Sequence, residues 1–203
     1  MTVTRKISRL PTRRATRLPG CVTATSGGGD PGNPLPAFAA DTTDYDYASD
    51  NRTGTIPAWQ IASDSLVSID VSDNELEGEP PEVNLMLPVM EALISIKANN
   101  CGLGPMFVRM ALGETVDTIK MADNAFTDAD TEAFTDCAVL SLVDLSGNAF
   151  TEAGMENLFT AFDGAGVTNC IIKTEGGTSA APNVATLAII ASLTLAGCTV
   201  TTN

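Results

Sequence analysis

The feature of the sequence that most restricts its fold is a pattern that returns about every 25 residues. The segments "LVSIDVSDNEL", "VDTIKMADNAF" and "LSLVDLSGNAF" place apolar residues at fixed distances from an asparagine, in the form L-x-x-L-x-L-x-x-N-x-L. A unit this short cannot bury its apolar residues alone, so successive units must stack on one another. The spacing predicts stacked repeats, each with a short strand whose alternate side chains point inward.

Further copies of the pattern are less regular. In one of them Ile94 and Ile96 take the apolar positions, and in the last one the strand is placed at Leu193 and Leu195. The irregular copies are anchored, in chain order, at Asp50, Asn99, Glu175 and Cys198. Each asparagine side chain is expected to bond with backbone groups buried in the turn that follows the strand. The predicted turn ladder comprises Asn74, Asn99, Asn124, Asn148 and Cys198.

These motifs resemble those of the leucine-rich repeat family, over residues 45–203. The resemblance implies an α/β solenoid of about six to seven turns, with a parallel sheet on one face. Some return segments are predicted to be helical, because Thr127 and Thr151 stand at N-cap positions and each is followed by an acidic residue. An extended arm is expected to precede this body.

The arm is assigned to residues 1–40 and the solenoid to residues 41–203, because charge and composition change between them. The segment 20–44 is rich in glycine and proline, as linkers are. All cations of the first 17 residues precede the first acidic residue and give that segment a charge of +6, against −20 for the rest of the chain. An acidic body repels nucleic acid, so any nucleic-acid contact is expected only from residues 1–17. The predicted arm contacts are Arg5, Lys6, Arg9, Arg13, Arg14 and Arg17.

Catalysis is not expected from this sequence. It contains no histidine, which removes the most common general base and the serine–histidine and cysteine–histidine arrangements. The five cysteines include no C-x-x-C pair, so buried, reduced thiols are the favoured interpretation. Asp128, Asp130 and Glu132 have the spacing of half a calcium loop but lack its glycine and closing glutamate, and a helix start explains them better. We therefore expect no enzyme activity, metal or cofactor.

The expected interaction surfaces are the exposed strand positions and the last copy. The candidate concave-face residues are mixed in charge and lack the aromatic and arginine side chains typical of strong interfaces. In the last copy, Thr194 and Ala196 are placed on an exposed strand, as a C-terminal interface covered by a second subunit, a partner or the arm. No charged side chain follows Glu175 to protect that strand. The candidate concave face comprises Asp70, Ser95, Lys120, Asp144 and Lys173.

Together these features favour a non-enzymatic structural or interaction protein. A basic arm, a linker and an acidic body are similar in layout to subunits of large assemblies such as bacteriophage virions, where decoration, adaptor, fibre and baseplate components occur. The expected partners are other protein subunits, in a homo-oligomer or a hetero-assembly. The alternative is an organelle-targeted or cytosolic recognition module, with the arginine-rich start as an address. Neither a secretory signal nor a membrane span is expected, because the apolar segment 184–196 is too short to cross a bilayer.

Overall fold

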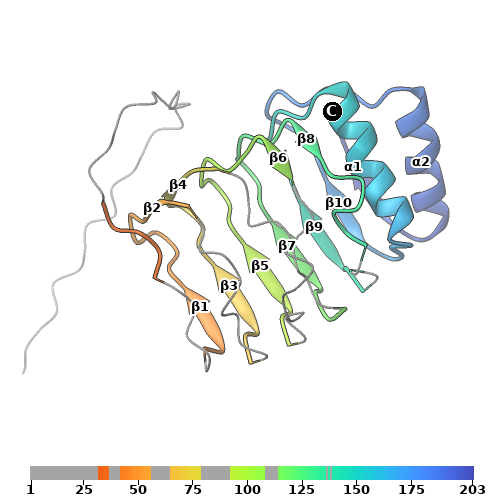
Figure 1. The fold of residues 1–203 in the computed structure, drawn as a ribbon. Coiled ribbons are helices and arrows are strands. Elements are labelled where there is room, and N and C mark those ends of the chain that lie inside the picture. The colour runs from red at the N-terminus through yellow and green to blue at the C-terminus, as the bar shows by residue number, and fades with distance from the viewer. Residues whose placement is uncertain are drawn as a thin grey trace, which may run out of the picture. The chain divides into compact units, whose positions relative to one another are not determined.

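A computed structural model describes residues 32–36, 42–55, 65–78, 92–107, 114–135, 137 and 139–203. The chain divides by its contacts into residues 1–30 and a body that begins at Pro31. Within the described part of the body, nine short strands come first, and two helices then alternate with the last two strands (Figure 1). The seven strands of the main sheet are β1 (Asp44–Asp46), β3 (Ser68–Asp70), β5 (Ser95–Lys97), β7 (Thr118–Lys120), β9 (Leu142–Asp144), β10 (Ile171–Lys173) and β11 (Thr199–Thr201).

The main sheet is parallel, and its strands lie side by side in chain order. The α/β class and the parallel sheet predicted from the repeat are thus confirmed. A second, discontinuous line of strand pairs joins β2 (Thr53–Gly54) to β4 (Glu75–Leu76) and β6 (Met106–Phe107) to β8 (Asp128–Ala129), also in parallel. Figure 1 shows these two short strand pairs apart from the main sheet.

One column of apolar side chains crosses the middle of the sheet and forms the centre of the core. The strand register aligns seven residues, of which all but the half-buried Val200 are at most 3 % exposed. β-Branched side chains pack well on a pleated surface, which explains why three-residue segments suffice as strands when a neighbour lies on each side. The column comprises Tyr45, Ile69, Ile96, Ile119, Val143, Ile172 and Val200.

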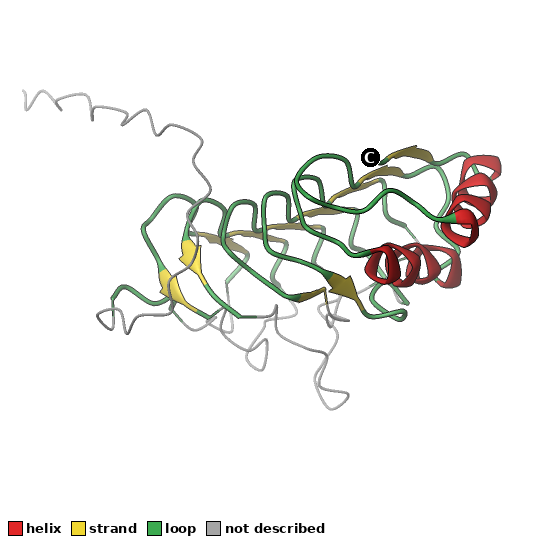
Figure 2. Ribbon diagram, turned by 90° about the horizontal axis from the view of Figure 1, so that it is seen from above, coloured by secondary structure: helices red, strands yellow, loops and turns green. Residues whose placement is uncertain are grey.

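Two helices follow in the last third of the chain and lie next to each other at one end of the body (Figure 2). Helix α1 (Glu152–Gly164) begins as predicted at Thr151, whose side chain accepts a hydrogen bond from the amide of Gly154. The helix start predicted at Thr127 is wrong: β8 and a series of turns occupy residues 128–135. The described ranges contain no helix long and apolar enough to cross a membrane.

Helix α2 (Val184–Leu195) lies where the sequence predicted the last strand. Asn183 caps it by accepting a hydrogen bond from the amide of Thr186. Thr194 is therefore a helical residue, Ala196 is the helix C-cap, and neither belongs to a strand. The last strand is instead β11, in which Val200 aligns with Ile172. Cys198 accordingly precedes a strand and does not occupy an asparagine position.

The copy anchored at Asn99 is also out of phase with the prediction. Ile96 aligns with Ile69, so the position that corresponds to Asn74 is Cys101, two residues after Asn99. Ala98 is fully buried, whereas Ile94 is 48 % exposed. The buried positions of this unit therefore follow the register of its neighbours and not the most apolar side chains.

The body begins earlier than the predicted boundary at residue 40. Pro34 forms a parallel bridge with Thr53, and Leu35 is buried in the core. Asn33 donates a backbone hydrogen bond to the side chain of Thr53 and accepts one from the guanidinium of Arg52. Residues 33–35 thus form part of the first unit. The six predicted arm contacts, Arg5 to Arg17, lie outside the described residues.

Candidate functional site

Three of the predicted asparagines bind two successive turns at once. The amide of Asn148 donates to the carbonyl of Leu145 in its own turn at 2.8 Å and to that of Met121 in the preceding unit at 3.1 Å, and its oxygen accepts from the backbone N–H of Phe126 at 3.2 Å. Asn74 and Asn124 repeat this arrangement. Asn74 and Asn148 are buried, and Asn124 is half-buried. These side chains satisfy buried backbone groups, which is a structural role.

Cys101 takes the ladder position in the third unit. Its thiol donates to the carbonyl of Val71 at 3.1 Å, in the preceding unit, as an asparagine amide would do. Its own backbone N–H donates to the side-chain oxygen of Asn124 at 3.1 Å. Asn99 lies outside the ladder and accepts instead from the backbone N–H of Ala122. The spacing of Leu93, Ala98 and Leu103 around Cys101 could have revealed this phase from the sequence.

The ladder changes its chemistry after Asn148. In the next unit the hydroxyl of Ser179 accepts a hydrogen bond from the backbone N–H of Phe150 at 3.1 Å, in place of an asparagine oxygen. Asn203 then binds the carbonyls of Ser179 and Gly176 through its amide nitrogen. Sequence reasoning missed Ser179 and Asn203, because neither stands at the expected spacing from a strand. Cys198, which it included, aligns with Cys170 in front of the neighbouring strand.

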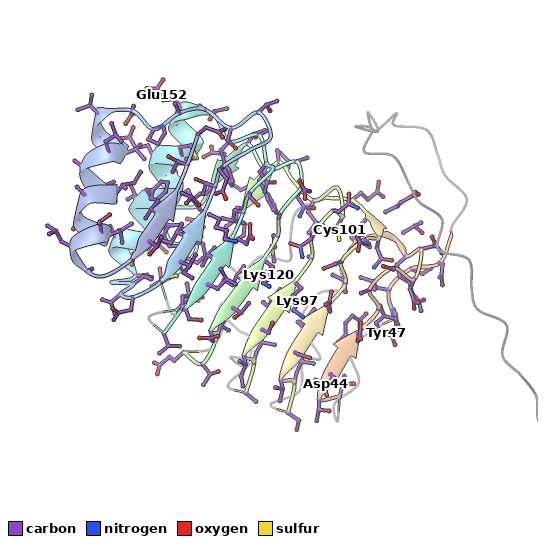
Figure 3. The ribbon with its side chains drawn as sticks, turned by 180° about the vertical axis from the view of Figure 1, so that it is seen from behind. Asp44, Tyr47, Lys97, Cys101, Lys120 and Glu152 are labelled. Atoms are coloured by element: carbon purple, nitrogen blue, oxygen red, sulfur yellow. The ribbon has the colours of Figure 1, made fainter. Side chains whose placement is uncertain are left out.

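Charged side chains form one row across the exposed side of the main sheet. The register aligns Asp70, Lys97, Lys120, Asp144 and Lys173 on successive strands, and Figure 3 shows Lys97 and Lys120 on adjacent strands. We call these five residues the charged row. Four of the five predicted concave-face residues belong to it. Ser95 does not, because the two-residue phase error had put it in the place of Lys97; it aligns with Ser68 and Thr118 instead.

The charged row is partly neutralised by its own ion pairs. Lys97 lies 3.4 Å from Asp70, and Lys173 lies 3.6 Å from Asp144. Pairs this exposed contribute at most about 1 kcal/mol to stability. Lys97 and Lys120 are cross-strand neighbours of equal charge, and Lys120 also aligns with Asp144 on its other side. All three lysines of residues 18–203 lie in this row.

A second surface lies on helix α2, which is apolar on both of its sides. Thr186 and Leu193 are buried, and Ile189 and Ile190 pack against the core. On the opposite side Val184 is 85 % exposed, Leu187 is 53 % exposed and Leu195 is 91 % exposed. With the exposed alanines between them, these residues follow helical spacing along one line. We define the α2 stripe as Val184, Leu187, Ala188, Ala191 and Leu195.

The titratable groups with resolved shifts are perturbed by burial and not by a reactive neighbour. Burial raises the pKa of Cys101 from 9.0 to about 11 and that of Cys170 to about 12, and it also raises the pKa of Tyr45. Such thiols are inert, because the thiolate is the nucleophile. Within the described ranges, no three histidine, cysteine or acidic residues lie together as metal ligands would.

The two thiols give a test of this environment. At pH 8 we expect iodoacetamide to label Cys101 and Cys170 in the folded protein at least about 100-fold more slowly than in the unfolded chain, because the thiolate fraction falls tenfold for each unit of raised pKa. The raised pKa values also make the free energy of unfolding depend on pH. Because the folded pKa values exceed the unfolded ones, burying the neutral thiols contributes fully to stability below about pH 9, and this contribution is lost as the pH rises toward 11 to 12. Peptide mass spectrometry of labelled samples measures the rates, with urea-unfolded protein as the control. Equal rates in both states would contradict burial of the thiols.

The arrangement defines an α/β protein with a seven-stranded parallel sheet, a charged row on that sheet and an apolar stripe on its last helix. No family model matches the chain, and none of the curated proteins matches it in sequence.

Proposed function

We propose that this chain is a non-enzymatic structural or interaction protein, built as a short leucine-rich-repeat solenoid. The repeat fold is supported by the chain-order parallel sheet and by the side chains of Asn74, Cys101, Asn124 and Asn148, each of which bonds to the preceding unit. Stacked units with short strands and variable return segments are typical of solenoids. Their exposed surfaces commonly serve as binding faces.

The observation that carries the proposal is the α2 stripe. Single apolar side chains on a protein surface are ordinary, but a continuous apolar line along a helix is a mark of a protein interface. Leu195 and Val184 expose most of their surface to water in the isolated chain. Covering them removes apolar area from water at about 25 cal/mol per Å². A second protein surface is the partner that fits, because the stripe runs the length of an exposed helix and contains no polar side chain to orient a small ligand.

The charge distribution supports a role in a large assembly, such as a virion or a comparable particle. Residues 1–17 carry +6 and the rest of the chain −20, so the start of one subunit is electrostatically complementary to the body of another. Association through such an arm weakens as the salt concentration rises. This arrangement would favour anchoring by the arm in addition to contact through the α2 stripe.

Affinity purification of the tagged full chain from its native source tests the proposal, in cells that also express an untagged copy. We expect at least one protein, either a different chain or the untagged copy, to co-purify in fixed stoichiometry. The Leu187→Glu/Leu195→Glu variant should lose it, because two charges would be buried in the contact. Thr160→Glu, on the exposed side of α1, is the matched control and should retain it. Two results would contradict the proposal: recovery of the parent chain without a partner, or equal recovery of the partner with the parent, with Leu187→Glu/Leu195→Glu and with Thr160→Glu.

A further inference from the structure

The two edges of the main sheet differ in how they are covered. At the β1 edge, Leu35 is only 5 % exposed, and the hydroxyl of Tyr45 donates to the carbonyl of Pro36 at 2.5 Å. Strand β1 itself exposes Asp44 and Asp46, and charges of this kind oppose pairing with another strand. Within the described part of the chain, β11 pairs only with β10, on one side. Its exposed residues are uncharged threonines.

The free side of β11 presents a self-complementary set of backbone groups. The N–H of Thr199 donates to the carbonyl of Cys170 at 2.8 Å, and the carbonyl of Thr201 accepts from Thr174 at 2.9 Å. Alternate residues of a strand bond to a given neighbour, so the N–H and C=O of Val200 point away from β10. Two copies of β11 placed antiparallel, with Val200 opposite Val200, would exchange both of these bonds. A two-fold axis midway between the two Val200 residues relates the copies, so both form the same backbone hydrogen bonds.

The α2 stripe lies next to this edge. Helix α2 connects β10 to β11 and packs against both β11 and α1. Antiparallel pairing of two identical edge strands has its two-fold axis perpendicular to the sheet, so the helices of both copies fall on the same face. Figure 1 shows α2 as the outermost helix, on the side of the sheet remote from β1. The same association that pairs the strands therefore brings the two α2 helices toward each other.

The occupant that these observations select is a second copy of this chain. The body outside residues 1–17 carries −20, which makes contact between two bodies unfavourable over most of their surface. Residues 176–203 contain no charged side chain, and the acidic side chain that contacts β11 is Glu175, whose carboxylate accepts a hydrogen bond from the hydroxyl of Thr201. This region therefore meets its own copy with less repulsion than the rest of the body. An acidic or basic partner would gain nothing here. Closed two-fold dimers are also the most common form of self-association.

We infer that two copies of this chain form a two-fold dimer, in which β11 pairs antiparallel with β11 of the second copy and the α2 stripes are covered. The inference rests on the proposed function and specifies its partner and geometry. The seven-stranded sheet would become continuous across the dimer, through the bonds of Val200. Thr199 of one copy would face Thr201 of the other as a pair that shares no backbone hydrogen bonds, with Cα atoms about 4.5 Å apart.

Sedimentation equilibrium of the full chain measures the association, and cysteine cross-linking measures its register. We expect the parent to sediment as a dimer and Leu187→Glu/Leu195→Glu to raise the dissociation constant by at least about tenfold. Thr160→Glu should leave it unchanged. In a Cys21→Ser background, Thr199→Cys/Thr201→Cys should form a disulfide-linked dimer on mild oxidation, because facing positions of this kind match disulfide geometry. Thr199→Cys alone should cross-link far less, since two copies of position 199 are not opposite each other.

The outcomes separate the inference from the proposed function. A dimer that the α2 variant leaves intact, or one in which the single and double cysteine variants cross-link equally, overturns the inference. A parent that stays monomeric at every concentration also overturns it. In that case, loss of a different co-purified protein from Leu187→Glu/Leu195→Glu would still support the proposed function. Deleting residues 2–31 completes the series: monomers that dimerise only after the deletion would show that the chain's own start covers this edge, which also contradicts the inference.

Discussion

Replacing Asn148 by alanine is expected to lower the free energy of unfolding by about 3 kcal/mol. The side chain is 1 % exposed and bonds with the backbone of Leu145, Met121 and Phe126. Alanine leaves these groups in a dry interior without partners, and each stranded group costs about 1–3 kcal/mol. The effect reaches two units, because Asn148 connects its own turn with the preceding one.

Urea unfolding followed by circular dichroism measures this change, with two variants for comparison. Asn124→Ala should cost less than Asn148→Ala, because Asn124 is half-buried and water can reach part of its turn. Asn99→Ala should cost least, since Asn99 lies outside the ladder and holds only one backbone amide, that of Ala122, at 2.9 Å. Equal losses for Asn99→Ala and Asn148→Ala would mean that the ladder is assigned in the wrong phase.

The regular copies could be predicted because their spacing and their chemistry agree. In the units of Asn74, Asn124 and Asn148, the apolar positions are filled by large side chains that are fully buried in the structure. One strand residue from each unit then determines the register of the whole sheet. These three units carry the resemblance to leucine-rich repeats, and that resemblance implied the α/β class and the parallel sheet.

The unit of Cys101 was misplaced by two residues because its most apolar side chains are not its buried ones. Ile94 looks like a core residue but is 48 % exposed. Ile96 takes the core position that was assigned to Ile94, and Ala98 takes the one that was assigned to Ile96. An asparagine at 99 strengthened the wrong phase. The neighbours resolve the ambiguity, since backbone bonds on both sides of β5 admit only the register of Ile69 and Ile119. The same error exchanged Ser95 for Lys97 in the charged row.

Helix α2 was missed because its sequence has no polar face, and without one the helical period cannot be recognised. In "VATLAIIASLTL" apolar and small residues occur at nearly every position, so a helix and a buried strand are equally compatible with the pattern. The available signals were at its ends: Asn183 in a capping position and Gly197 after the last turn. The lack of a polar side is also what leaves the α2 stripe apolar, so the feature that hid the helix is the one on which the proposed function rests.

The ladder changes at Gly177, which aligns with Asn148 through the register of β9 and β10. The repeat pattern places an asparagine at this position, and the pattern alone predicts that restoring it stabilises the protein. The structure predicts the opposite. The backbone of Gly177 has φ +61°, and a Cβ atom there would lie 2.1 Å from the carbonyl oxygen of Asn148. That oxygen already accepts a hydrogen bond from the N–H of Thr178 at 3.0 Å, so it cannot move without breaking the contact between the two units.

We therefore expect Gly177→Asn to lower the free energy of unfolding by about 3–4 kcal/mol, by adding steric overlap with backbone to the strain of a positive φ. Gly176→Asn is the matched control: it makes the same change at φ +81°, but its Cβ would lie 3.6 Å from the nearest atom, so only the smaller cost of the left-handed backbone applies. Urea unfolding of both variants gives the comparison. If Gly177→Asn proves as stable as Gly176→Asn or more so, the turn accepts the asparagine and the close approach of Asn148 to Gly177 is wrong. If the expected order is found, the hydroxyl of Ser179 is the acceptor for Phe150 because the position of the asparagine is closed to any side chain.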